Sequence, residues 1–182
     1  MLEVELDLSD DWNGDQDWQA LADVAVKAAF AVSSHGYLAS APFVLSLSIS
    51  LSTNAEVQTL NAQWRGKDKP TNVLSFPMMA PSELDALANT DDGEVLLGDM
   101  ILAFETCQAE AADKAIPLKN HVTHLIVHGT LHLLGLDHTD DIQAEHMEEM
   151  EVKALASLGL ANPYGANPYS EYLTQTEAAK PI

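Results

Sequence analysis

The sequence predicts an α/β (α+β) fold with a single small mixed sheet of about four strands and helices packed on it. Two observations support this prediction. Segments with alternating apolar and polar residues are interspersed with segments that have the apolar spacing of amphipathic helices. The expected elements follow the order β-α-β-α-β-β-α-α-α, and no change of composition marks a domain boundary. Residues 1–164 are therefore expected to form one domain, followed by a flexible C-terminal tail over residues 165–182.

Four segments have the pattern of strands. Residues 2–8 alternate apolar residues with acids, which is typical of a strand with one buried face. Residues 43–51 alternate again and are rich in leucine and β-branched residues. Residues 72–76 form a short strand that Pro77 ends, and residues 95–103 are apolar enough for a buried strand.

Five segments have the pattern of helices. Apolar residues recur at helical spacing from about Asp17 to Ser34, and Gly36 follows as a terminator. Thr53 and Glu56 form a capping-box pattern, so a helix is expected from there to about Trp64. Three more helices are expected over residues 105–115, 117–134 and 140–158, with Thr139 as the N-terminal cap of the last one.

Two connections stand out between these elements. Residues 65–71 read RGKDKPT and are expected to form a loop. Residues 78–93 contain Pro81, Gly93 and several acids, so we expect an irregular, mobile surface excursion there.

The composition favours a cytoplasmic globular protein. Hydrophobic residues make up 47% of the chain, and no apolar run approaches the 18 residues of a membrane span. The acidic N-terminus does not have the pattern of a signal peptide. The one cysteine, Cys107, cannot form an intramolecular disulfide, and we expect it in the core.

The charge distribution is strongly acidic with one local exception. The formal net charge is −20, which argues against broad, non-specific nucleic-acid binding. Arg65, Lys67 and Lys69 nevertheless lie within five positions, and Arg65 is the only arginine. This cluster is the obvious place to hold an anion. The alternative is that it is a solvated loop.

The histidines concentrate in residues 128–138, which read HGTLHLLGLDH. Positions four apart share a helix face, separated by roughly 6 Å along the axis, so His128 and His132 can hold one ion. Gly135 suits a helix end with positive φ, after which His138 can reach the same ion. Three imidazoles leave one tetrahedral position for water, the pattern of a catalytic zinc. We therefore expect one Zn²⁺ per chain.

Polar residues near this stretch leave alternatives open. His121 and His124 continue the helical stripe, but His124 is too far along the axis to bind the ion with the other three. His124 either supports the site or is a partly exposed polar residue. Asp137 either accepts a hydrogen bond from a ligand imidazole or caps the turn. His146 lies among glutamates and is expected at the surface.

The spacing also matches the zinc peptidases, whose helix reads H-E-x-x-H and whose long form adds a glycine and a third histidine. In this chain, Gly129 replaces the glutamate that serves the peptidase reaction as general base. The segment therefore predicts a zincin-like metal helix without the peptidase mechanism. A base or an anion-binding group has to come from elsewhere in the chain.

Three co-linear blocks resemble the YbeY family of bacterial endoribonucleases, the metalloproteins of rRNA maturation. The blocks are HGTLHLLGLDH at 128–138, the segments LN, WRGKD and TNVLSFP within 60–77, and LGD at 97–99. Together they cover about residues 55–140. Trp64 stands where the family pattern has tyrosine, and Asn72 stands where many members have aspartate.

The resemblance implies a zinc-dependent, single-strand-specific endoribonuclease that acts in rRNA maturation, notably at the 3′ end of 16S rRNA, and in ribosome quality control. It implies that His128, His132 and His138 bind Zn²⁺ and that Arg65 is the catalytic basic residue. The implied partners are single-stranded RNA, the small ribosomal subunit and assembly factors, with no membrane or DNA partner. Zinc and Arg65 would stabilise the charge of phosphodiester cleavage, with water or the RNA 2′-hydroxyl as nucleophile.

Two other functions use the same metal pattern. A zinc hydrolase of peptides or small esters would need a carboxylate base, for which Glu94 or Asp99 is available. A non-catalytic ribosome-assembly factor would use the ion structurally, with four protein ligands instead of three.

Overall fold

The centre of the fold is a four-stranded sheet with the strand order β1-β2-β4-β3. The structure, a computed structural model, describes residues 1–165. The strands are β1 (Leu2–Leu8), β2 (Val44–Ser52), β3 (Val73–Pro77) and β4 (Glu94–Ala103). Strands β1, β2 and β4 run parallel, and β3 pairs antiparallel with β4. The predicted α/β class with one small mixed sheet is confirmed.

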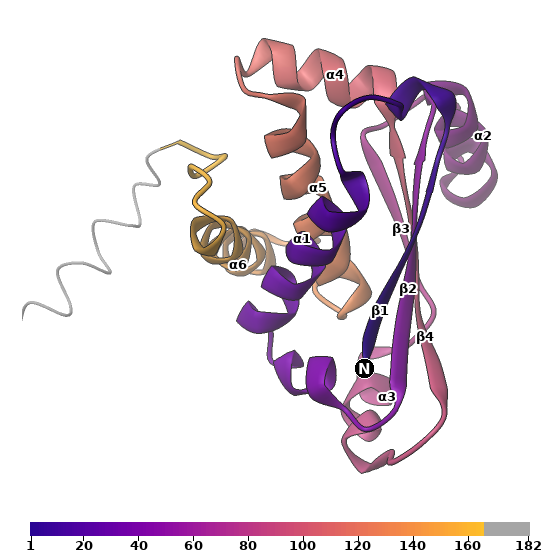
Figure 1. Cartoon of the computed structure of the whole chain (residues 1–182), viewed down its shortest axis with the longest axis vertical. Coiled ribbons are helices and arrows are strands. Elements are labelled where there is room, and N and C mark those ends of the chain that lie inside the picture. The colour runs from indigo at the N-terminus through magenta and orange to yellow at the C-terminus, as the bar shows by residue number, and fades with distance from the viewer. Residues whose placement is uncertain (166–182) are drawn as a thin grey trace, which may run out of the picture.

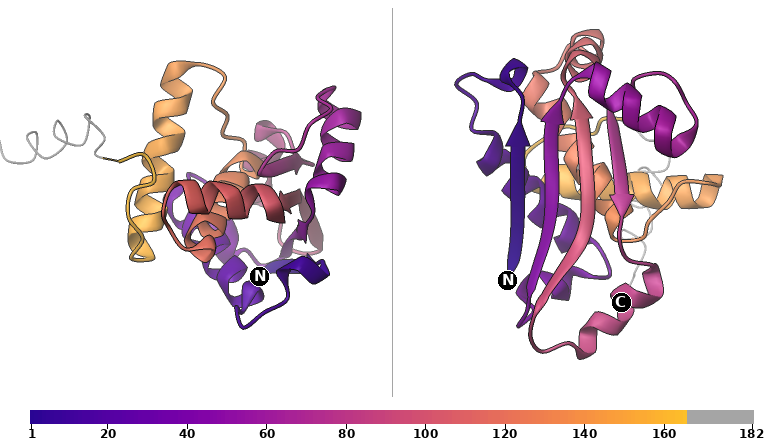
Figure 2. Two further views of the ribbon diagram at one scale, coloured as in Figure 1. Left: turned by 90° about the horizontal axis from the view of Figure 1, so that it is seen from above. Right: turned by 90° about the vertical axis from the view of Figure 1, so that its right-hand side faces the viewer.

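The helices lie mainly on one face of this sheet. They are α1 (Trp18–Val32), α2 (Asn54–Arg65), α3 (Pro81–Ala86), α4 (Phe104–Asp113), α5 (Leu118–Leu133) and α6 (Asp141–Ser157). Short 3₁₀ turns occur at η1 (Asp10–Trp12), η2 (Gly36–Ser40) and η3 (Leu87–Asn89). Helices α1 and α5 cover the sheet, and α6 packs on their outer side (Figure 1). Helix α2 crosses the upper part of the opposite face, beside β3 and β4 (Figure 2).

Apolar spacing explains this layering. Ala22, Ala25, Val26 and Ala29 form a fully buried face of α1, and their small side chains allow a close approach to α5. Helix α5 is buried nearly all round, because the sheet, α1, α4 and α6 all pack against it. Of the histidines of α5, His121 and His124 are therefore buried, and His128 and His132 near its C-terminal end remain partly exposed.

The helix starts follow the predicted capping chemistry with small differences. The Asp17 carboxylate accepts the Ala20 N–H at 2.9 Å at the start of α1. Thr53 caps α2, but Glu56 accepts from the Ser52 hydroxyl, so only half of the predicted capping box forms. Helix α6 is capped by Asp140, one residue after the expected Thr139.

The expectation for residues 78–93 was wrong. This segment contains α3 and η3, and it buries Leu84 and Leu87 in the main core. The proline and the acids suggested an exposed loop, but the two leucines, three positions apart, provide one apolar face. The segment therefore closes one end of the core.

The division into residues 1–164 and a flexible tail stays a prediction, and residues 166–182 lie outside the described part of the chain. Within residues 1–165, no helix has the length and apolar character needed to span a bilayer.

Cys107 provides a test of the core. Its side chain is fully buried on α4, and burial raises the pKa of the thiol to about 12. Since the thiolate is the reactive form, the folded protein should not react with a thiol reagent at pH 8, whereas denaturant should release one equivalent. Spectrophotometric thiol titration measures this difference, and rapid labelling of the native protein would contradict the packing.

Candidate functional site

Three histidines converge at the C-terminal end of α5. One ring nitrogen from each of His128, His132 and His138 lies within 4.8 Å of the others. Helix α5 presents the first two, and the turn after it returns the third. Gly135 enables this turn with a φ of 87°, and a Cβ at this position would also lie only 3.2 Å from Pro81. These three residues can hold a metal ion.

The two helical histidines already use their Nδ1 atoms. His132 Nδ1 donates to the Leu136 carbonyl at 2.9 Å, and His128 Nδ1 donates to the Glu151 carboxylate at 2.7 Å. In the neutral form each imidazole carries one N–H, here on Nδ1, which leaves a lone pair on each Nε2; the two Nε2 atoms face each other at 3.1 Å. Facing lone pairs repel unless a cation lies between them. Nitrogens on one tetrahedral zinc are roughly 3.3 Å apart, so the donor set fits a metal ion.

The protonation of His132 agrees with this fit. Burial, and after it the neighbouring His128, lowers the pKa of His132 to about 4. His132 is therefore neutral at physiological pH, and its Nε2 lone pair is available to a metal without loss of a proton.

Glu151 on α6 supports the histidine cluster from behind. Its side chain is 1% exposed, and its two oxygens accept from His128 Nδ1 and from His124 Nε2, the latter at 2.6 Å. The Tyr164 hydroxyl donates to the same carboxylate. Burial alone would raise the pKa of Glu151, but the hydrogen bonds from the two histidines outweigh it and lower the pKa to about 2. The carboxylate is thus ionised and fixes the orientation of His128.

The structure also decides between the alternative roles that the sequence left open for the nearby polar residues. His124 is buried and contacts the ligand-supporting Glu151, so it is not a partly exposed surface residue. His121 is buried as well and bonds Glu110 at 2.6 Å. Asp137 accepts the backbone N–H of His138 at 2.8 Å, so it caps the turn. His146 is exposed, as expected.

Sequence reasoning did not identify Glu151 or Tyr164. A signal for Glu151 was present, because it is the single acid in the buried face of α6, between Met147 and Leu155 at spacings of four. An acid on an apolar stripe has to be paired in the folded protein. Tyr164 carries no such local signal, and burial and the Glu151 charge raise the pKa of its phenol, which keeps it a hydrogen-bond donor.

Arg65 shares a cleft with two of the three histidines. It is the last residue of α2, and its Nη2 donates to the Ser75 carbonyl on β3 at 3.4 Å. Arg65, His132 and His138 line one cleft of about 380 Å³. The basic loop after Arg65 is held by Asn61, whose side-chain amide donates to the Lys69 carbonyl at 2.7 Å. The loop is therefore anchored, although its charged side chains are exposed.

The packing around Gly129 argues against the peptidase alternative. A Cβ at this position would lie 3.0 Å from Ser75 Oγ and 3.1 Å from Met100 Sδ. Residue 129 thus faces the sheet, where a glutamate has no room and cannot reach the histidines. Asp99 lines the opposite face of the sheet and Glu94 is exposed at the start of β4, so neither faces the cleft.

The family model described as Endoribonuclease YbeY matches residues 9–159 of this chain. The chain is 55% identical over 164 residues to Endoribonuclease YbeY of Sphingopyxis alaskensis, covering 90% of this chain and 98% of that protein. It is 52% identical over 164 residues to Endoribonuclease YbeY of Rhizorhabdus wittichii, covering 90% of this chain and 97% of that protein.

The fold is also similar to a solved structure. The solution structure of TM1509 from Thermotoga maritima aligns with a TM-score of 0.51 and 18% identity, covering 91% of this chain and 97% of that one. At this identity the similarity supports the fold alone.

Replacing Glu151 tests its support of the metal centre. We expect Glu151→Gln to weaken metal binding about 10- to 100-fold, because the amide no longer supplies the charge that orients His128. Competition of Co²⁺ or Zn²⁺ with a chromophoric chelator measures the affinity. Glu145→Gln, on the exposed side of α6, is the matched control and should bind as the wild type does. Equal affinities for both variants would exclude the support role.

Gly129→Glu tests the packing that separates this site from a peptidase. The variant restores the letters H-E-x-x-H, yet we expect a loss of more than ~3 kcal/mol in unfolding free energy and no peptide hydrolysis, because the carboxylate is forced against the sheet. Urea denaturation measures the loss. Gly14→Glu is the control, since a Cβ at Gly14 meets nothing within 4 Å. A stable Gly129→Glu protein with peptidase activity would reverse the argument.

Proposed function

The chain belongs to the YbeY endoribonuclease family, and from this we propose that it is a zinc-dependent endoribonuclease specific for single-stranded RNA. We further propose that it acts in the cytoplasm on ribosomal RNA, at the 3′ end of 16S rRNA and in ribosome quality control. The observation that carries the biochemical part is the cleft shared by Arg65, His132 and His138. It combines a metal-binding donor set with a group suited to phosphate.

Each residue has a distinct part in the proposed reaction. His128, His132 and His138 hold the ion, and Glu151 and the Leu136 carbonyl keep two of these rings in the required tautomer. A bound zinc supplies Lewis-acid stabilisation of the charge that develops on the phosphate. Arg65 holds the non-bridging oxygens, since its planar guanidinium can donate two parallel hydrogen bonds to them. Its bond to the Ser75 carbonyl aims the guanidinium at the cleft.

The acidic body of the protein makes partners part of the proposal. With a formal net charge of −20, the surface repels RNA except near Arg65, Lys67 and Lys69. The isolated enzyme should therefore bind RNA weakly and with strong salt dependence. We propose that the small ribosomal subunit and its assembly factors direct it to its cleavage site.

Arg65 and the metal are tested by one cleavage assay. Purified protein and a labelled single-stranded RNA should give cleavage that a chelator abolishes and added Zn²⁺ restores. His128→Ala should be inactive because the ligand set is incomplete, and Arg65→Ala should lose about 100- to 1,000-fold in rate. Arg65→Lys should fail as well, because lysine keeps the charge but lacks the two-pronged donor geometry. Rates come from gel analysis of single-turnover reactions.

Lys67→Ala is the matched control, because it removes one positive charge from the same loop without touching the cleft. It should change the rate far less than Arg65→Ala does. Activity that survives both the chelator and the His128 and Arg65 substitutions would refute the proposal and indicate a contaminating nuclease. A 2′,3′-cyclic phosphate on the product would identify the 2′-hydroxyl as the nucleophile, since attack by water cannot form it.

A further inference from the structure

An exposed aromatic surface lies directly beside the proposed cleavage cleft. Trp64 precedes Arg65 on the last turn of α2, and its side chain is 65% exposed. The other two tryptophans, Trp12 and Trp18, are 2% and 8% exposed and belong to the core. An indole left in water contributes little to folding, so this position calls for an explanation outside the core.

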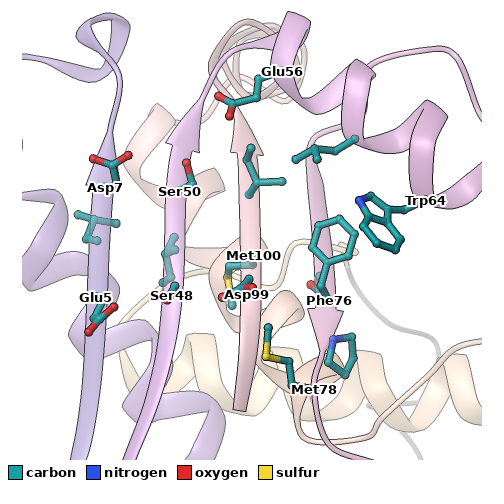
Figure 3. A pocket seen from close by; sticks show the side chains of 16 residues that line it. Glu5, Asp7, Ser48, Ser50, Glu56, Trp64, Phe76, Met78, Asp99 and Met100 are labelled. Carbon is teal, nitrogen blue, oxygen red and sulfur yellow. The ribbon is translucent and has the colours of Figure 1, made fainter. Parts of the chain in front are cut away.

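Trp64 packs against one neighbouring aromatic ring. Its ring meets the ring of Phe76 on β3 edge-on, with centroids 6.5 Å apart and an interplanar angle of 66°. Met78, the first residue after β3, is 53% exposed and continues the apolar strip along the same edge. Figure 3 shows Trp64 beside Phe76, with Met78 further along the strand. We call Trp64, Phe76 and Met78 the aromatic platform.

The platform and the cleft lie on either side of β3 and meet at its residues. Ser75 and Pro77 line both the cleft that contains Arg65 and the hollow that the platform borders. Because Trp64 and Arg65 are consecutive residues at the end of α2, an RNA strand with one phosphate at Arg65 can bring an adjoining nucleotide to Trp64 by crossing the edge of β3.

Charge restricts where a nucleic acid can enter this hollow. The hollow is also lined by the acidic residues Glu5, Asp7, Glu56 and Asp99, which repel phosphates, and Asp99 pairs with Phe76 across the sheet. At the platform end, the exposed side chains of Arg65, Lys67 and Lys69 supply positive charge. A nucleotide with its uncharged, flat base against Trp64 and its phosphates toward the basic loop keeps its negative charge away from the acidic residues.

We propose that Trp64 is a stacking subsite for one unpaired RNA base, next to the nucleotide whose phosphate lies at Arg65. The inference rests on the proposed ribonuclease function and adds a physical source for its preference for single strands. Aromatic side chains stack on unpaired bases of any sequence, whereas the faces of bases in a duplex are covered by their neighbours.

Removing the Trp64 ring and removing the stacked RNA base should weaken RNA binding to a similar extent. Binding of a labelled single-stranded RNA at low salt is measured by fluorescence anisotropy for the wild type, Trp64→Ala and Trp64→Phe. We expect Trp64→Ala to weaken binding roughly 5- to 100-fold and Trp64→Phe to retain most of the affinity, because phenylalanine still stacks. Tyr37→Ala, which removes an aromatic ring that is 46% exposed away from the cleft, is the matched control and should not change binding.

An abasic scan of the same RNA then locates the partner of Trp64. In the wild type, one abasic position near the cleavage site should cause a loss similar to that of Trp64→Ala, and this position should have no further effect in the Trp64→Ala protein. Quenching of tryptophan emission by the intact RNA, lost with the abasic one, gives an independent reading because Trp12 and Trp18 are buried.

The outcomes separate this inference from the proposed function. If the wild type cleaves RNA but Trp64→Ala binds it normally, the stacking subsite is wrong and the indole serves another contact, such as a protein partner. If Trp64→Ala weakens binding and no abasic position couples to it, the subsite is also wrong. If the wild type neither binds nor cleaves RNA, the proposed function itself fails and this inference falls with it.

Discussion

Helix α5 approaches the sheet so closely at Gly129 that any side chain there would press on Ser75 and Met100. This contact sets the position of the metal helix relative to β3 and β4. With residue 129 against the sheet, His128 and His132 lie on the flank of the helix, roughly 100° and 60° around its axis from Gly129. From there His128 reaches Glu151 of α6, and His132 reaches the Leu136 carbonyl in the turn that leads to His138. The helix is buried on nearly every side, so its rotation about its own axis is fixed by packing.

Ser75 connects the two halves of the proposed site through this contact. Its hydroxyl lies beside Gly129 of α5, and its carbonyl accepts the Arg65 guanidinium. A single residue of β3 thereby sets how far Arg65 stands from the histidines. Strand β3 is also the only antiparallel strand of the sheet in the described residues, and its far end carries Phe76 beneath Trp64. The proposed phosphate contact, the three histidines that can hold a metal ion and the aromatic platform are thus all positioned relative to β3.

The Glu151 carboxylate shows why an acid can be buried in this protein. An isolated ionised carboxylate would be costly in the interior, but two imidazoles and a phenol surround this one with donors. The same bonds that compensate for its burial also orient His128. Support of the site and stability of the α5–α6 contact therefore depend on the same group.

The sequence by itself determined the local features of this protein. Periodicity placed all four strands and five of the helices, and the spacing of His128, His132 and Gly135 predicted a turn that brings three imidazoles together, because helix geometry relates nearby residues directly. Tertiary structure alone decided the rest. Glu151 lies 23 positions from His128, Ser75 lies 54 positions before Gly129, and Leu84 enters the core from a segment that looked like a loop. Such pairs depend on how the whole chain packs, and no local backbone rule relates residues so far apart in the sequence.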